Sequence, residues 1–218
     1  MRALSRPVHS PQTGPHQRLE EIVARHRAHP FRKPAAEHSR AAYSELMAIW
    51  DGRAPLVLDT GCGVGLSTLR LARAKPDCLV VGIDQSLDRL QRRKAESRPD
   101  NALLLRADMV DIWMLLAADG ARPAEQWMLY PNPWPKPQHL QRRWHGHAVF
   151  PVALSLGGRL ELRSNWRIYA EEHALALGLL AGRRAAVEAW QPEAALTPFE
   201  AKYRDSGHAL WRVAVELD

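Results

Sequence analysis

Short apolar runs alternate with longer amphipathic stretches along most of the chain. A run such as 78–83 has the length of a buried strand, whereas 167–180 has the length and spacing of a helix. The pattern predicts strands over 56–58, 78–83, 102–105, 126–130, 159–163, 185–190 and 208–216, and helices over 66–74, 86–96, 109–118, 139–155 and 167–180. Because strands and helices alternate, we expect an α/β fold with a mostly parallel sheet and helices on both faces.

The first 54 residues differ from the rest of the chain. Residues 1–17 combine prolines with polar residues, which is typical of a disordered tail. Two helices are predicted over 18–29 and 35–50, and Pro30 and Pro34 separate them because proline interrupts a helix. No boundary is visible after residue 50. We therefore expect a tail (1–17), N-terminal helices (18–54) and one α/β domain (55–218).

Charge and composition narrow the possible partners. The chain has 30 Lys and Arg against 24 Asp and Glu, and this net charge of +6 favours a polyanion such as nucleic acid. The only cysteines, Cys62 and Cys78, cannot form a disulfide framework or a closed zinc site, and the histidines lack ligand partners at metal-binding spacing. No metal is expected. No secretory signal or bilayer-spanning apolar run is visible, so we expect a cytoplasmic protein without a membrane partner.

The segment after the first predicted strand is rich in glycine. Residues 59–65 read Asp-Thr-Gly-Cys-Gly-Val-Gly and follow 56–58 directly, at the strand end where open α/β sheets bind ligands. Gly61, Gly63 and Gly65 permit a tight turn and let the backbone approach a ligand. The spacing differs from the Gly-x-Gly-x-x-Gly of dinucleotide sites. Asp59 is therefore predicted to face a cationic amino-acid portion of the ligand rather than a pyrophosphate.

Acidic residues also follow the next two predicted strands. Asp84, with Gln85 beside it, is placed to accept hydrogen bonds from two ribose hydroxyls. Ala107 and Asp108 are placed to contact an adenine, and Asp108 is expected to accept a hydrogen bond from its amino group. The constellation resembles the class I S-adenosylmethionine-dependent methyltransferase superfamily over about residues 55–165. The resemblance implies a Rossmann-like, seven-stranded sheet whose last strand is antiparallel, with S-adenosylmethionine as the methyl donor.

A proline-rich loop follows the fourth predicted strand. Residues 130–137 read Tyr-Pro-Asn-Pro-Trp-Pro-Lys-Pro. The four prolines stiffen the loop, which suits the alignment of an acceptor atom with the methyl group. The basic and aromatic stretch 138–144 comes next and suits phosphates and bases. From the residues alone, a rigid structural loop followed by a solvated basic helix remains an alternative.

Four motifs in order resemble the tRNA (guanine-N7)-methyltransferase family, which has Phe-Pro-Asp-Pro-Trp-x-Lys, His-x-Lys-Arg-Arg, a Gly-Gly strand ending in Thr-Asp-Trp, and Thr-x-Phe-Glu. The counterparts here lie at 130–136, 139–143, 157–166 and 197–200. The resemblance implies tRNA as the partner and places Asn132 at the reacting base as the catalytic position. The substrate and RNA contacts that it implies are Lys136, His139, Arg142, Arg143, Asn165, Trp166, Thr197, Phe199 and Glu200.

Three departures from the family pattern keep other functions open. Asn132 and Asn165 stand where the family has aspartates, and Gln141 stands where it usually has lysine. Guanine N7 carries a free lone pair, so its methylation needs no general base. An amide, however, offers a donor where a carboxylate offers only acceptors. The alternatives are a non-catalytic protein that binds donor and tRNA, a methyltransferase for an exocyclic amine, suggested by Asn132-Pro133, and one for a small molecule. A monomer is expected.

Overall fold

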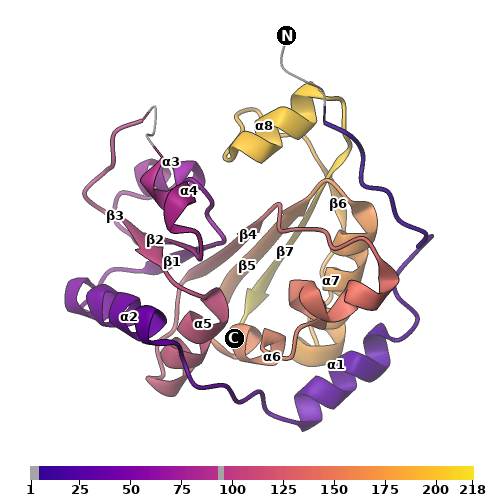
Figure 1. The fold of residues 1–218 in the computed structure, drawn as a ribbon, viewed down its shortest axis with the longest axis horizontal. Helices are drawn as coiled ribbons and strands as arrows, with labels where there is room; N and C mark the ends of the chain where they lie inside the picture. The colour runs from indigo at the N-terminus through magenta and orange to yellow at the C-terminus, as the bar shows by residue number, and fades with distance from the viewer. Residues whose placement is uncertain (1–4, 93–95) are drawn as a thin grey trace.

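A twisted seven-stranded sheet forms the centre of the molecule (Figure 1). The structure, a computed structural model, describes residues 5–92 and 96–218. The strand order is β3-β2-β1-β4-β5-β7-β6, and β7 runs antiparallel to its neighbours β5 and β6. The strands are β1 (Leu56–Thr60), β2 (Leu79–Asp84), β3 (Ala102–Arg106), β4 (Glu125–Leu129), β5 (Gly158–Ser164), β6 (Glu188–Trp190) and β7 (Leu210–Leu217). The predicted Rossmann-like sheet with an antiparallel last strand is confirmed.

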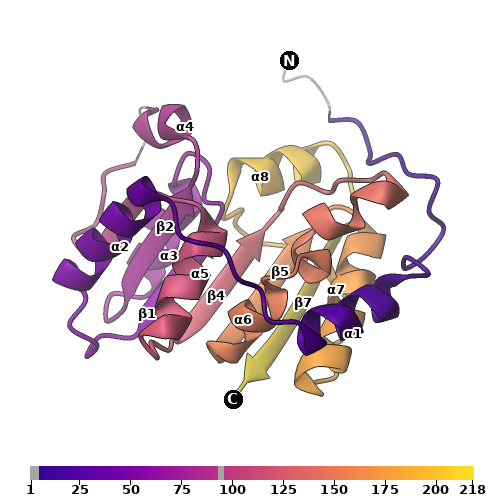
Figure 2. The same cartoon turned by 60° about the horizontal axis from the view of Figure 1, so that its bottom comes forward.

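Helices cover both faces of the sheet, as predicted (Figure 2). One face packs against α1 (Leu19–Ala28), α2 (Glu37–Ile49), α5 (Met109–Ala118), α6 (Phe150–Ser155) and α7 (Arg167–Ala181). The other face packs against α3 (Leu66–Ala74) and against Tyr203 of α8 (Pro198–Asp205). Alternate residues of one strand serve the two cores, since Leu56 and Leu58 of β1 face one and Val57 faces the other. The short helix α4 (Leu87–Gln91) follows β2.

The predicted helix over 139–155 is wrong, because three short elements replace it. These are the 3-10 turns η1 (Pro137–Arg142) and η2 (Trp144–Gly146), then α6. A side chain at Gly146 would collide with the backbone oxygen of Leu140, 2.2 Å from an added Cβ, so the chain folds back here more tightly than a continuous helix allows. The predicted helix over 86–96 ends at Gln91, and residues 93–95 lie outside the described part. Helix α8 was not predicted from the sequence.

The N-terminal segment (residues 5–17) is extended and attached to the domain, which corrects the expected disordered tail for these residues. It runs from the end of α8 past α7 to α1 (Figures 1 and 2). The Ser5 amide donates to Ser206 Oγ at 2.9 Å, and Ser10 Oγ donates to the Pro135 carbonyl at 2.6 Å. Residues 1–4 of the predicted tail lie outside the described residues. None of the helices in the described ranges is long and apolar enough to cross a membrane.

Candidate functional site

The glycine turn after β1 is held by buried hydrogen bonds. The amides of Gly61 and Cys62 both donate to the Ile83 carbonyl of β2, at 2.9 and 3.0 Å. Asp59 Oδ2 accepts from Ser67 Oγ at 2.6 Å and from Thr68 Oγ1 at 2.7 Å, both on α3. Burial raises the pKa of Asp59 to about 6, although these hydroxyls act against the shift. Asp59 therefore anchors α3 to the turn, and its contact with a donor stays a prediction.

The three predicted glycines adopt backbone conformations that favour glycine. Their φ angles are +71° at Gly61, +61° at Gly63 and +80° at Gly65, which is the N-cap of α3. A Cβ added to Gly61 or Gly63 would meet no atom of residues 5–92 or 96–218 within 4 Å, so these residues leave the space over the turn open. The turn therefore combines a tight backbone with room for a ligand to approach it.

Asp84 connects the second predicted strand end to the glycine turn. Its Oδ2 accepts from the Gly63 amide at 2.9 Å, and its Oδ1 accepts from the Ser86 amide at 2.8 Å. Arg89 of α4 forms an ion pair with the same carboxylate at 3.1 Å. Gln85, predicted beside it, is exposed. The structure thus brings together Asp84 and the glycines, as the sequence predicted, and adds Arg89, which sequence reasoning missed.

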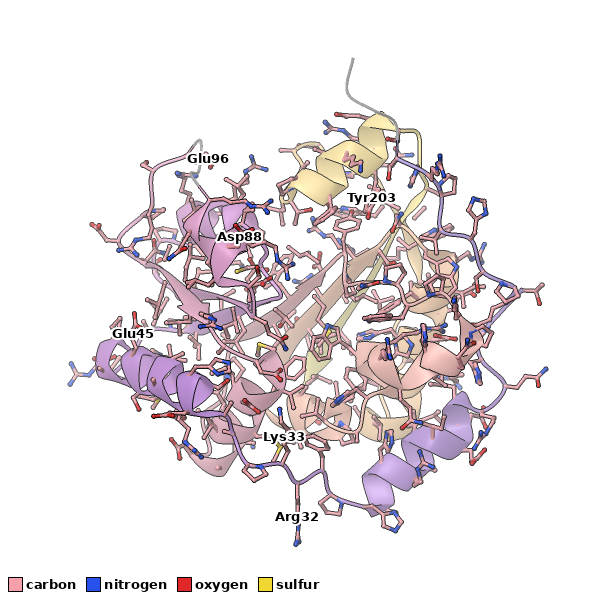
Figure 3. The ribbon with its side chains drawn as sticks, in the orientation of Figure 1. Arg32, Lys33, Glu45, Asp88, Glu96 and Tyr203 are labelled. Carbon is pink, nitrogen blue, oxygen red and sulfur yellow. The ribbon has the colours of Figure 1, made fainter. Side chains whose placement is uncertain are left out.

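The third strand end lies next to the second. The Ala107 amide donates to the Asp84 carbonyl at 3.2 Å, and Ala107 is fully buried. Asp108 is the N-cap of α5 and accepts from the Val110 amide at 2.9 Å. Lys33, on the connection between α1 and α2 (Figure 3), forms an ion pair with Asp108 at 3.3 Å. The three strand ends therefore form one continuous edge, as predicted, and the N-terminal helices reach it through Lys33.

The proline-rich loop after β4 is strained and lies beside the glycine turn. Strands β1 and β4 are neighbours, with Asp59 paired to Trp127, so the segments that follow them lie side by side. Tyr130 and Trp134 have φ angles of +52° and +44°, which are unfavourable for residues with a side chain. Asn132 is exposed, and its Oδ1 accepts from the Trp134 amide at 3.3 Å. Such strain persists only where surrounding contacts fix it, and it is concentrated at functional sites.

Three of the predicted RNA contacts lie on the outside of this loop. Lys136 and Arg142 are exposed, and His139 is half-buried. The Arg142 guanidinium lies 4.7 Å from the centre of the Trp134 ring, and the His139 ring meets that indole edge-on at 5.5 Å. The cations are therefore available to solvent beside an aromatic ring, which suits contact with phosphates and bases.

The structure corrects the expectation that Arg143 neutralises a phosphate. Its side chain is fully buried and forms an ion pair with Glu172, which is fully buried on α7. Its Nε donates to the Trp134 carbonyl at 3.2 Å, and its guanidinium lies 4.8 Å from the Trp166 ring centre. Trp166 is itself buried. Both side chains therefore support the proline-rich loop from inside and present no surface to RNA.

Thr197 and Glu200 need the same correction, because both are buried. Thr197 caps α8 by accepting from the Glu200 amide at 2.9 Å. Glu200 Oε1 accepts from Tyr130 Oη at 2.8 Å, Arg163 at 3.0 Å and Trp190 Nε1 at 3.1 Å. The motif therefore ties α8 to the ends of β4, β5 and β6. In the sequence, Thr197 followed by Glu200 has the form of a helix capping box, a signal that could have revealed α8.

Asn165 and Phe199 belong to an aromatic group that sequence reasoning missed. Phe199 is 52% exposed and stacks on Tyr203 at 6.0 Å, and Tyr203 stacks on His208 at 5.3 Å. Asn165 Nδ2 lies 3.2 Å from His208 Nδ1. Figure 3 shows Tyr203 below α8, on the side facing the sheet, where it meets Tyr130. The loop and α8 therefore share one aromatic contact zone.

Comparison with known proteins identifies the family. A family model described as "Putative methyltransferase" matches residues 53–213. The tRNA (guanine-N(7)-)-methyltransferase of Acidovorax sp. (strain JS42) is 30% identical over 78% of this chain and 71% of that protein. The protein of the same name from Nitrosococcus oceani is 28% identical over 84% of this chain and 83% of that protein.

Solved structures agree on the fold. The 16S rRNA methyltransferase KamB superposes with a TM-score of 0.60 at 20% identity, over 85% of this chain and 97% of that one. The aminoglycoside resistance methyltransferase NpmB1 gives a TM-score of 0.54 at 19% identity, over 81% of this chain and 93% of that one. The family model matches most of the chain, and a 30% identical relative spans most of both chains. This chain therefore belongs to the tRNA (guanine-N7)-methyltransferase family of class I methyltransferases.

Proposed function

We propose that the protein transfers a methyl group from S-adenosylmethionine to N7 of a guanine in tRNA. The observation that supports this best is the continuous edge formed by the glycine turn, Asp84 and Ala107, with Asn132 on the adjoining strand end. A donor at that edge would have its reactive end beside the proline-rich loop. A base held by the loop would then lie within reach of the donor.

The residues present fit S-adenosylmethionine. The open space over Gly61 and Gly63 accommodates a ligand that a Cβ would obstruct. The Asp84 carboxylate is fixed by two backbone amides, and each oxygen has a further lone pair for vicinal ribose hydroxyls, which would reach it once Arg89, its ion-pair partner, moves aside. Asp108, at the next strand end, is placed to accept from an amino group such as that of adenine. When bound, the donor supplies an electrophilic methyl group on a sulfonium.

Guanine N7 is an acceptor for which this chain has suitable groups. Its lone pair is free, so the enzyme removes no proton from the attacking atom and acts mainly by alignment. Asn132 Oδ1 accepts from the Trp134 amide at 3.3 Å, and the Asn132 amide nitrogen is a donor that a base could use. Guanine O6, next to N7, is an acceptor for that donor. Asn132 then orients the base, and no carboxylate is required.

Methylation of an exocyclic amine is the weaker assignment for this chain. Asn132-Pro133 suggests it, but relatives that match most of the chain are named tRNA (guanine-N(7)-)-methyltransferases.

The exposed groups around the loop give the proposed tRNA contacts. Lys136 and Arg142 would contact phosphates, and Phe199, stacked on Tyr203, would contact a base by stacking. Arg143 and Glu200 would act only through the loop and through α8, because both are buried. Binding would then depend on salt mainly through the exposed cations.

The class of RNA is tested by offering labelled S-adenosylmethionine together with unmodified tRNA and 16S rRNA in one reaction. The proposal predicts label in the tRNA and background label in the rRNA. Label in the rRNA alone would contradict it. Label in neither RNA, with donor binding intact by calorimetry, would favour a small-molecule acceptor or a non-catalytic role.

A further inference from the structure

The N-terminal segment (residues 5–17) contacts both parts of the proposed acceptor site. Ser10 Oγ donates to the Pro135 carbonyl of the loop at 2.6 Å. The Ser5 carbonyl lies 3.0 Å from His208 Nε2, and the other ring nitrogen of His208 meets Asn165. These contacts span sequence separations of 125 and 203 residues. The segment therefore connects the proline-rich loop to the His208 and Asn165 side of the proposed acceptor site.

A buried carboxylate fixes the far end of the segment. Glu172 Oε1 accepts from Gln12 Nε2 at 3.0 Å and from the His16 amide at 2.9 Å. Its Oε2 accepts from Arg143 Nη1 at 2.5 Å and from His145 Nε2 at 2.8 Å. Oε1 thus accepts from the N-terminal segment, and Oε2 accepts from residues that follow the loop.

Gln12 also contacts the cation that supports the loop. Its Oε1 accepts from Arg143 Nη2 at 2.6 Å, and the same nitrogen donates to the Trp134 carbonyl at 3.1 Å. Trp134 is strained, with a φ of +44°, so its conformation depends on the groups that hold it. The Lys136 carbonyl, at 3.4 Å, is a third acceptor of Arg143 Nη2. Loss of Gln12 therefore removes the shortest of three hydrogen bonds of a fully buried guanidinium nitrogen, which is costly. Gln12 therefore completes the hydrogen bonding of the group that fixes Trp134.

We propose that Gln12 is a positioning residue, through which the N-terminal segment holds the proline-rich loop in its strained conformation. Gln12 acts through Arg143 on the Trp134 carbonyl, and Ser10 acts directly on Pro135. The segment is then part of the acceptor site. The catalytic consequence rests on the proposed function, whereas the consequence for the mobility of the loop does not.

The test compares Gln12→Ala with Gln17→Ala, a matched control because Gln17 is exposed on the same segment. Hydrogen–deuterium exchange is followed over residues 134–147, where the amides of His139, Arg143 and Gly146 are hydrogen-bonded. Single-turnover methylation of tRNA and donor affinity by calorimetry are measured on the same variants. Gln12→Ala should exchange faster over 134–147 and transfer methyl on the order of tenfold more slowly at saturating tRNA, with donor affinity unchanged.

Gln17→Ala should match the wild type in all three measurements. Exchange in Gln12→Ala equal to that in Gln17→Ala would overturn the proposal, and so would faster exchange with no loss of rate in an active enzyme. If the wild-type protein methylates no tRNA, the proposed function fails. The exchange comparison still decides whether Gln12 positions the loop.

Discussion

Asp59 and Asp84 show that similar carboxylates at neighbouring strand ends have different tasks. Both Asp59 contacts go to hydroxyls of α3, inside the domain. Asp84 is also buried, but it contacts the backbone of the glycine turn and the exposed Arg89. The sequence predicts both as donor contacts, because strand-end position does not reveal which way a carboxylate points.

The first prediction concerns donor binding by Asp84. Replacing it with alanine should weaken binding of S-adenosylmethionine about tenfold or more, because the ribose hydroxyls lose a charged acceptor. Asp88→Ala is the control, since Asp88 is an exposed carboxylate four residues further along the chain (Figure 3). Isothermal titration calorimetry gives both affinities. Equal affinities for the two variants would remove Asp84 from the donor site.

The second prediction concerns the amide of Asn132. If its nitrogen donates to guanine O6, a carboxylate at this position has no donor for that oxygen. Asn132→Asp should therefore lower the rate of guanine N7 methylation about fivefold, for roughly the 1 kcal/mol of one hydrogen bond. Single-turnover kinetics with tRNA measure the rate, and Asn132→Ala, which also lacks the donor, should likewise be slower than wild type. An Asn132→Asp enzyme as fast as wild type or faster would show that the amide nitrogen does not orient the base.

At the scale of elements, α8 is tied to the sheet by one buried carboxylate. Glu200→Gln removes one of the two carboxylates that pair with Arg163, the other being Glu161, and should lower the free energy of unfolding by about 2 kcal/mol. Glu193→Gln, at an exposed position before α8, should change it little. Urea unfolding of both variants makes the comparison. A Glu200→Gln protein as stable as Glu193→Gln would mean that Glu161 alone compensates the charge of Arg163.

Some elements of the fold could be predicted from the sequence and others could not. All seven strands were predicted, because strands form short apolar or alternating runs. Glycine or acidic residues at or just after the last strand residue mark where β1 to β3 end. The turns η1 and η2 were not predicted, because they depend on the close approach of Gly146 to Leu140, which no local pattern encodes. The N-terminal segment was missed for a similar reason. Its polar residues have partners more than a hundred residues away, such as Glu172 and Pro135.

The sequence also predicts the donor side of the candidate site better than the acceptor side. The donor side could be predicted because each residue lies at a strand end, and strand ends meet at one edge of the sheet. On the acceptor side, the sequence places Arg143 and Glu200 in the right region but cannot show that both are buried. Lys33, His208 and Gln12 come from distant segments and carry no motif. Only the folded chain brings them to the site.

For the whole molecule, buried histidines set the response to acid. Burial lowers the pKa of His26, His145, His147 and His173, so the unfolded chain binds more protons than the folded protein as pH falls below about 6.5. Their stabilising contribution is therefore complete above about pH 6.5 and is lost below it. Asp59, whose folded pKa is about 6, acts in the opposite direction, but it is one group against four.

The free energy of unfolding should thus fall between pH 7.5 and roughly pH 5, as measured by urea unfolding at fixed ionic strength. His173→Phe should make that fall shallower, because both ring nitrogens of His173 are buried without a hydrogen-bond partner in the described part of the chain. His38→Phe is the control, since His38 is exposed on α2. A His173→Phe protein with the wild-type pH dependence would exclude His173 as a source of the acid sensitivity.

Identification of the methylated nucleoside shows whether the protein transfers methyl to guanine N7 in tRNA. Unmodified tRNA is incubated with the protein and labelled S-adenosylmethionine, then digested and analysed by chromatography. We predict label in 7-methylguanosine, and much less when Asp84→Ala replaces the wild type at limiting donor. Label in a methylated adenosine or cytidine, or an unlabelled tRNA pool despite donor binding, would contradict this prediction.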